Sequence, residues 1–186
     1  MSLYRTNYLK CFFMLVVAFF LSSCSSTKVD DYAKETPVLK LSQYFNGKTQ
    51  AYGIFTDRSG KVVKRFTVNM VSTWKIVDGI NTGTLDESFL YSDGTTQKRI
   101  WTIREVSPNN YEGTADDVVG KAIGKASGNA LNWRYTLLLP VDGKNIEVQF
   151  NDWMYLVTGK VMLNRAEMSK FGIYLGEVTL SFSKED

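Results

Sequence analysis

The chain has 186 residues, with 22 Lys and Arg against 19 Asp and Glu, two cysteines and no histidine. The absence of histidine excludes Ser-His-Asp catalysis and histidine-ligated zinc or haem, and we expect no cofactor and no metal site. The charges nearly balance. We therefore expect no nucleic-acid partner, because a domain that binds one usually has a basic stripe and a pI above about 9.

The first residues have the pattern of an export signal. Arg5 and Lys10 precede an apolar run from Cys11 to Leu21, and small polar residues follow it. A basic start, an apolar stretch of about 7–15 residues and a small-residue cleavage site are typical of such a signal. The run is too short to span a bilayer, which takes about 20 residues. Residues 1–23 are therefore predicted to be a signal peptide.

The stretch Leu21-Ser22-Ser23-Cys24 resembles the lipobox of bacterial lipoproteins. In that class the cysteine becomes the lipidated first residue of the mature chain, and a serine after it, here Ser25, implies sorting to the outer membrane. Acyl chains bury methylene groups at about 0.8 kcal/mol each, so several of them hold a soluble domain firmly. We expect Cys24 to carry lipid, which makes the membrane a partner and leaves the domain facing the periplasm.

Residues 24–37 are then the lipidated cysteine and a polar tether, and residues 38–186 form a single domain. Turn-forming stretches such as "DRSGK", "SDGTT" and "VDGK" recur along this domain at short intervals. The segments between them are rich in Val, Ile, Thr and aromatic residues, and several alternate. Many short strands with regular turns indicate an antiparallel sandwich or barrel.

Turn length predicts which residues face one another in one hairpin of this domain. We expect Ser92-Asp93-Gly94 to form a three-residue loop with Gly94 in the left-handed conformation. The register then places Leu85 opposite Trp101. It also places Glu87 opposite Arg99, so an acid and a base lie in the middle of an apolar, aromatic face.

A second hairpin is predicted from a two-residue turn at Asp142-Gly143. Its register places Tyr135 opposite Phe150. It also places Trp133 opposite Asp152, so a second acid faces the core.

A tight turn at Thr158-Gly159 would place Asp152 opposite Arg165, again on the core-facing side. Buried charges are costly unless they are paired. The two acid–base pairs are therefore either internal salt bridges that fix the register or a polar clamp for a carboxylate or phosphate head group below an apolar cavity. The candidate ligand-binding residues are Glu87, Arg99, Trp101, Trp133, Tyr135, Asp152 and Arg165.

Two stretches resemble ligand-binding motifs but do not match them. "GKAIGKAS", residues 120–127, is one residue short of the spacing of a phosphate-binding loop. "TADDVV", with Asp116 and Asp117, does not begin a calcium-binding loop. Neither stretch predicts a phosphate or metal site.

Residues 120–130 can instead form the first half of one long strand. One face would then have only small residues: Ala122, Gly124, Ala126, Gly128 and Ala130. The other face would have Ile123, Leu131, Trp133 and Tyr135. Glycines in a strand mark a bend or the close approach of a ligand or a backbone. We interpret the bare face as tight barrel curvature, with room for a ligand as one alternative and a helical or disordered segment as another.

Several stretches together resemble domain-of-unknown-function family 3833, a group of proteobacterial lipoproteins: "DESFLYSDG", "YEGTADDVVGKAIGKASGNALNWRYTLLLPVDG" and "NDWMYLVTGKVMLNRAEMSKFG". The similarity runs from about Val38 to Lys184. Tyr52 stands where family members have Trp, and Asn151-Asp152 where they often have two acids. The resemblance implies an all-β fold, an antiparallel meander closed into a lipocalin-like barrel, and no established activity. "YFNGKTQAYGIF" is also similar to the opening Gly-x-Trp strand of lipocalins.

We expect an outer-membrane-anchored, periplasm-facing lipoprotein that binds an apolar ligand such as a fatty acid or phospholipid. Aromatic side chains would line its cavity, and Arg99 and Arg165 would hold the polar end of the ligand. The alternative is a non-catalytic assembly or scaffolding lipoprotein that acts through its outer surface, which requires a filled core and an exposed apolar patch. A third hypothesis is a lipid-modifying enzyme that works without His or Cys, with an acid or Lys of shifted pKa in a cleft.

Overall fold

The computed structural model describes residues 26–141 and 143–185, so the predicted signal peptide and Cys24 lie outside the described residues. Two short helices, η1 (Val29–Tyr32) and α2 (Leu41–Tyr44), precede the strands. The described part contains ten strands: β1 (Gly47–Asp57), β2 (Val62–Val77), β3 (Ile80–Tyr91), β4 (Thr96–Ser107), β5 (Asn110–Thr114), β6 (Ala122–Ser127), β7 (Ala130–Val141), β8 (Lys144–Leu156), β9 (Val161–Lys170) and β10 (Ile173–Lys184). Among these residues, no helix has the length and apolar character needed to cross a membrane.

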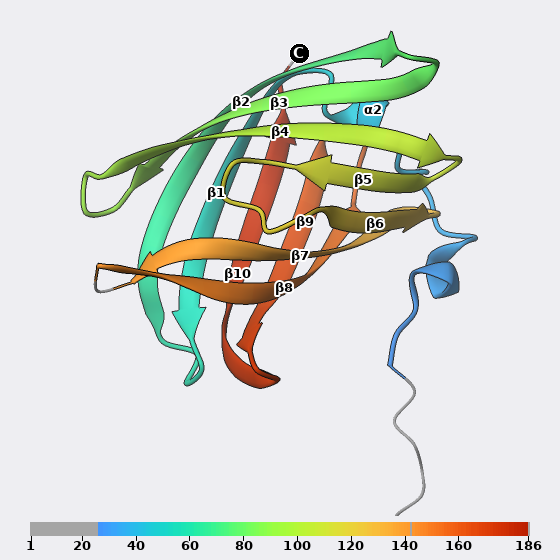
Figure 1. Ribbon diagram of the computed structural model, residues 1–186. Helices are drawn as coiled ribbons and strands as arrows, with labels where there is room; N and C mark the ends of the chain where they lie inside the picture. The colour runs from blue at the N-terminus through green and yellow to red at the C-terminus, as the bar shows by residue number, and fades with distance from the viewer. Residues whose placement is uncertain (1–25, 142, 186) are drawn as a thin grey trace, which may run out of the picture.

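The strands form a closed antiparallel barrel (Figure 1). Each strand pairs with its neighbours in the chain, and β1 also pairs with β10, which closes the meander. Successive side chains of a strand point to opposite faces. In β2, Phe66, Val68 and Met70 are therefore buried inside the barrel, while Thr67 and Asn69 are exposed. The predicted fold class is confirmed.

The two ends of the barrel differ. At one end, here called the helix end, α2 and its flanks contribute buried side chains, including Leu39, Leu41 and Phe45. The Tyr44 hydroxyl donates a hydrogen bond to the backbone carbonyl of Lys160 at 3.1 Å, which ties α2 to the β8–β9 connection. The opposite end, here called the mouth end, is formed by the β1–β2, β3–β4, β5–β6, β7–β8 and β9–β10 connections.

The barrel wall is interrupted between β4 and β7 on its mouth side. β5 pairs with β4 no further toward the mouth than Thr102, and β6 pairs with β7 no further than Arg134. Beyond these points the segment 115–121 crosses between the two longer strands (Figure 1). A single bridge between Val118 and Leu137 joins this segment to β7 as a strand partner. Part of the wall is therefore a loop.

Two of the three hairpin registers predicted from turn length are confirmed. Gly94 has φ of 81°, and Glu87 lies opposite Arg99. In the β7–β8 hairpin, Trp133 lies opposite Asp152. Short turns fix the pairing of the strands that they join, so these registers follow from local sequence.

The register predicted for the β8–β9 hairpin is wrong by one residue. The amide of Val157 donates to the carbonyl of Val161 at 2.9 Å, so the connection is one residue longer than a two-residue turn. Asp152 consequently lies opposite Ala166. A slip of one residue moves every following side chain to the other face. Arg165 therefore points out of the barrel.

The glycine-rich stretch is two strands rather than one long strand. β6 ends at Ser127, and Gly128 (φ 55°) and Asn129 turn the chain into β7. After this turn Trp133 lies opposite Gly124 on the inner face. A Cβ atom on Gly124 would overlap the Trp133 ring. The bare face of β6 thus makes room for a side chain of the protein itself.

The described part of the predicted tether lies against the outer wall of the barrel. The Tyr32 ring in η1 lies 6.0 Å from the ring of Trp153 and 5.4 Å from that of Tyr155. Asp30 forms an ion pair with Lys125 in β6 at 2.7 Å. The chain is therefore already docked on the barrel at Asp30, before the predicted domain begins.

Candidate ligand-binding cavity

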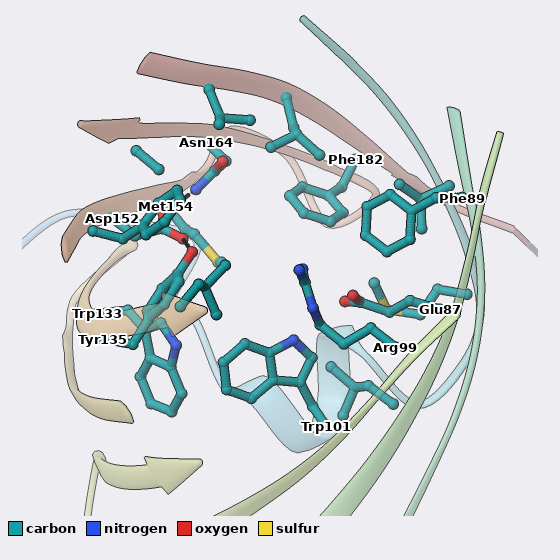
Figure 2. Close-up of a pocket in the computed structure, with 18 of the residues that line it drawn as sticks. Glu87, Phe89, Arg99, Trp101, Trp133, Tyr135, Asp152, Met154, Asn164 and Phe182 are labelled. Atoms are coloured by element: carbon teal, nitrogen blue, oxygen red, sulfur yellow. Dashed lines mark hydrogen bonds between the residues drawn. The ribbon is translucent and has the colours of Figure 1, made fainter. Parts of the chain in front are cut away.

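A cavity of about 200 Å³ lies inside the barrel. At the helix end its lining includes Leu41 and Phe45, and toward the mouth it includes Phe55, Phe89 and Leu139. The helix-end part is apolar, and the mouth part is mostly apolar, with Tyr91 and Gln97 as polar members joined by a hydrogen bond. Polar side chains interrupt this lining midway along the barrel (Figure 2).

Arg99 reaches the cavity because the alternation of β4 turns Arg99, Trp101 and Ile103 inward. Its guanidinium group binds the carboxylate of Asp117, which belongs to the segment that crosses the wall. Nε donates to Oδ1 at 3.1 Å and to Oδ2 at 3.0 Å, and Nη2 donates to Oδ2 at 2.7 Å. Such forked pairs are strong and geometrically specific. The partner that neutralises Arg99 is therefore Asp117 rather than Glu87.

Glu87 is buried on the neighbouring strand, directly opposite Arg99. Within the described residues its carboxylate has neither a hydrogen bond nor an ion pair, and Figure 2 shows it beside the Arg99 side chain. Burial raises the pKa of Glu87 to about 7, although the charge of Arg99 opposes the shift. The acid is thus divided between its neutral and charged forms near neutral pH.

Asp152 is the centre of a second polar group. The Tyr135 hydroxyl donates to Oδ2 of Asp152 at 3.1 Å, and the Asn164 side-chain amide donates to Oδ1. Burial raises the pKa of Asp152 to about 7, while these two hydrogen bonds act in the opposite direction. The cavity therefore contains two carboxyl groups that titrate near neutrality.

Aromatic rings connect the two polar groups. The Trp101 ring lies edge-on to Trp133 and to Tyr135, with centroids 6.1 Å and 5.6 Å apart. Tyr135 in turn stacks on Phe150 at 5.0 Å. Edge-on and stacked pairs of this kind stabilise aromatic clusters beyond their buried area. One side of the cavity is thus a fixed aromatic wall.

A family model for proteins of unknown function, DUF3833, matches residues 18–184. The chain belongs to the DUF3833 family. The family resemblance inferred from the sequence is confirmed. A comparison with the curated proteins found no match.

Solved structures share the fold of this DUF3833 chain at low sequence identity. An S-type phycobiliprotein lyase, CPES, from Guillardia theta is 5% identical, with a TM-score of 0.55 over 76% of this chain and 88% of the lyase. A DUF3598 protein of unknown function from Nostoc punctiforme is 12% identical, with a TM-score of 0.52 over 87% of this chain and 53% of its own. At such identities the similarity extends to the fold alone, and the barrel is lipocalin-like.

The structure of this DUF3833 chain brings six of the seven candidate residues to the cavity: Glu87, Arg99, Trp101, Trp133, Tyr135 and Asp152. Arg165 is the exception. Its side chain is 58% exposed on the outer wall and forms ion pairs with Glu177 at 2.8 Å and Glu167 at 3.2 Å. The placement of Arg165 in the site was wrong, and the role of the other six in binding stays a prediction.

Asn164 and Asp117 are polar residues of the cavity region that were not predicted for it, and Gln97 of β4 is a third. Asn164 was missed because the one-residue slip in the β8–β9 hairpin assigned it to the outer face. Asp117 lies in the stretch that does not form a calcium-binding loop, and from there its carboxylate reaches Arg99, 18 positions away in the sequence. A correct hairpin register would have identified Asn164. Asp117 lies in a loop, and a loop has no periodic pattern from which its position could be predicted.

Proposed function

We propose that this DUF3833 protein is an outer-membrane-anchored, periplasm-facing lipoprotein whose barrel binds an apolar ligand, such as a fatty acid or the acyl chain of a phospholipid. The observation that carries the proposal is the interior cavity, because a barrel built only for structural support can fill its interior with side chains. The lipobox at Cys24 supports the location. An anchor of this kind would keep the cavity close to a source of acyl chains.

The lining of the cavity suits a long apolar ligand with one polar group. The lining is apolar both at Leu41 and Phe45 and at Phe55 and Leu139, so an acyl chain can extend toward either end. Pockets for small molecules are typically apolar with a few placed polar groups that orient the ligand. In this barrel those groups would be the Glu87–Arg99 side and the Asp152–Tyr135 side.

Charge decides how a carboxylic acid head can be held. Arg99 is already neutralised by Asp117, and Glu87 adjoins it without a hydrogen bond in the described residues. A carboxylate placed beside Arg99 would therefore add a negative charge to a cluster that already has two acids. Proton uptake by Glu87 removes this conflict, since its pKa lies at about 7. A fatty acid would thus bind together with one proton.

The other two hypotheses have less support. The scaffolding alternative required a filled core, and the barrel contains a cavity. The enzyme hypothesis required an acid of shifted pKa, which Glu87 and Asp152 supply, but burial is the largest cause in both cases. Among the described residues, the cavity lining contains no Ser, Thr, Lys or Cys that could act as a nucleophile. Binding needs only the apolar lining and these placed polar groups, whereas covalent catalysis would have to use a carboxyl group or a Tyr hydroxyl as its nucleophile.

The proposal is tested on the full chain purified from its native envelope, by organic extraction and mass spectrometry of the non-covalently bound lipid. We expect an apolar lipid in near-stoichiometric amount. Ala166→Phe places a ring in the cavity and should remove the lipid, whereas Leu163→Phe, on the outer face of the same strand, should retain it. Equal lipid content in the two variants, or none in the unaltered protein, would contradict the proposal.

A further inference from the structure

Two hairpin tips at the mouth end lie side by side and expose apolar side chains. β1 pairs with β10 as far as Asp57 and Gly176, so the β1–β2 and β9–β10 tips are neighbours (Figure 1). Phe171 is 87% exposed and Ile173 is 62% exposed. We call the exposed apolar residues of these two tips the rim: Val62, Val63, Phe171, Ile173, Tyr174 and Leu175.

The turn at the β9–β10 tip is unusual in its sequence. Phe171 has φ of 51° and Gly172 has φ of 76°, so both central residues of this two-residue turn are left-handed. Turns of that geometry favour Asn-Gly or Asp-Gly, and a bulky residue with positive φ is uncommon. Here an aromatic ring takes the strained position and projects into solvent. Strain of this kind, together with exposed apolar surface, indicates a functional contact.

A β-bulge increases the apolar surface of the same tip. The pairing of β10 with β9 shifts between Tyr174 and Gly176, which leaves Leu175 as an extra residue. A bulge interrupts the inward–outward alternation and bends the strand. Ile173, Tyr174 and Leu175 are consequently all exposed in succession. A strand with strict alternation would have turned one of them inward.

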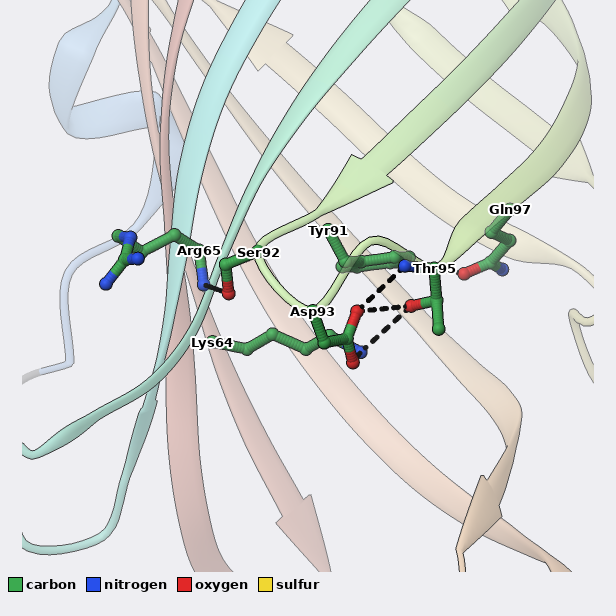
Figure 3. Close-up of polar contacts among 7 residues, drawn as sticks. All are labelled: Lys64, Arg65, Tyr91, Ser92, Asp93, Thr95 and Gln97. Carbon is green, nitrogen blue, oxygen red and sulfur yellow. Dashed lines mark hydrogen bonds and ion pairs between the residues drawn. The ribbon is translucent and has the colours of Figure 1, made fainter.

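Basic residues surround this apolar surface. Residues 57–64 and 170–175 contain four cations, Arg58, Lys61, Lys64 and Lys170, and a single acid, Asp57. Lys64 forms an ion pair with Asp93 of the β3–β4 tip at 2.8 Å (Figure 3). In the described part of the chain the other three cations have no ion pair. The apolar rim is therefore bordered by basic side chains, most of which are not neutralised by an ion pair in the described residues.

We propose that the rim inserts into the interfacial region of an anionic lipid bilayer, with Arg58, Lys61 and Lys170 against the phosphate groups. Apolar and aromatic side chains bordered by Lys and Arg are the composition that binds such an interface, and each basic residue near an anionic surface adds to the attraction. This docking turns the mouth of the cavity to the membrane. The docking itself does not depend on the proposed function. Only its purpose, which is the passage of ligand between the bilayer and the barrel, rests on that function.

The direction of the N-terminal segment agrees with this orientation. In Figure 1 the described residues before Val29 run toward the side of the molecule where the β1–β2 and β9–β10 tips lie. The described chain therefore approaches the barrel from the side on which the rim lies. The β2–β3 tip, with Ile76 69% exposed, lies at the helix end and serves as the matched control.

The experiment is amide hydrogen exchange of the full, lipid-anchored chain in vesicles of phosphatidylcholine, with or without added phosphatidylglycerol. We expect exchange at residues 171–175 to slow about tenfold or more when the anionic lipid is present, because each of the three basic residues adds to the attraction between the rim and an anionic surface. The β2–β3 tip should be unchanged. Phe171→Ser and Arg58→Glu should each abolish most of the protection, and Ile76→Ser should leave it intact.

Equal exchange at the rim in the two kinds of vesicle would overturn the proposal, and so would equal protection of the β2–β3 tip. Extraction and mass spectrometry of the same Phe171→Ser protein separate this result from the proposed function. If the variant loses rim protection but retains lipid in its cavity, the docking proposal is supported independently. If the unaltered chain has a protected rim but no lipid, the failure concerns the cavity alone.

Discussion

Asp117 joins the two strands that border the interruption in the barrel wall. Its carboxylate accepts the forked hydrogen bonds of Arg99 on β4, and its backbone carbonyl accepts a hydrogen bond from the amide of Leu138 on β7 at 2.8 Å. This loop residue thus links β4 to β7 in a part of the wall where the two strands do not pair with each other. The same residue sets the charge of the cavity, because it neutralises the arginine that faces the interior.

Asp117→Asn is expected to weaken this connection and release Arg99. The loss of one partner from a partly buried ion pair should lower the free energy of unfolding by about 2 kcal/mol, measured by urea denaturation. A freed guanidinium should also raise the affinity for a fatty acid several-fold relative to the matching fatty alcohol. Asp116→Asn, at the exposed neighbouring position, is the control and should change stability by less than about 0.5 kcal/mol. Equal effects from both substitutions would argue against a role for the Arg99 pair.

Glu87 should make the protein less stable as the pH rises. Burial raises its pKa from 4.5 to about 7, so between these values the folded state binds more protons than the unfolded state. The free energy of unfolding then falls as the pH rises through this window, by roughly 3 kcal/mol for a shift of this size, and levels off above it. Urea unfolding at pH 5 and pH 8.5 measures the difference.

Glu87→Gln should remove this share of the pH dependence and leave the share that comes from Asp152. Glu147→Gln, at an exposed position of β8, is the control and should preserve the full dependence. An unchanged pH profile in Glu87→Gln would show that Glu87 titrates normally in the folded protein.

Tyr135→Phe should raise the pKa of Asp152 above its value of about 7. The hydroxyl donates a hydrogen bond that stabilises the charged carboxylate, and its removal leaves Asn164 as the side-chain donor in the described structure. A loss of about one hydrogen bond corresponds to roughly one pH unit. The measurement is a carbon-13 NMR titration of the aspartate carboxyls. Tyr91→Phe removes a hydroxyl that donates to Gln97 instead, and it should leave Asp152 unaffected.

Gly124→Ala should destabilise the barrel because the added Cβ overlaps the Trp133 ring. Overpacking of a well-packed core typically costs about 1–3 kcal/mol, which thermal or urea unfolding can measure. Gly159→Ala is the matched control, since Gly159 has no positive φ and no atom lies within 4 Å of the Cβ position. That variant should be neutral or slightly stabilised. If Gly124→Ala were equally harmless, Trp133 would have room to move.

Local sequence was sufficient at two of the three hairpins for which a short turn was used to predict the pairing. Gly94 and the residues around it set Glu87 opposite Arg99, and the turn before Lys144 set Trp133 opposite Asp152. The alternation of the strands then turned these side chains inward. Most of the candidate site could therefore be predicted, because a strand has only two faces and a tight turn has few geometries.

The two wrong strand predictions came from one extra residue in a connection and from one turn that was not recognised. The longer β8–β9 connection exchanged Arg165 for Asn164 in the interior. Because the turn at Gly128 was interpreted as part of a strand, the contact between Trp133 and Gly124 was not predicted. Both errors arose at connections between strands, whose length the residues alone did not fix.

The sequence by itself determined the all-β fold and family of this protein, and it predicts an export signal and a lipid anchor, because these depend on periodicity, composition and short linear motifs. Only the tertiary structure decided that β1 closes the barrel against β10, that Asp117 reaches Arg99, and that the interior keeps a cavity. These features join residues far apart in the chain. Their geometry follows from how all the strands pack together, which no local pattern encodes.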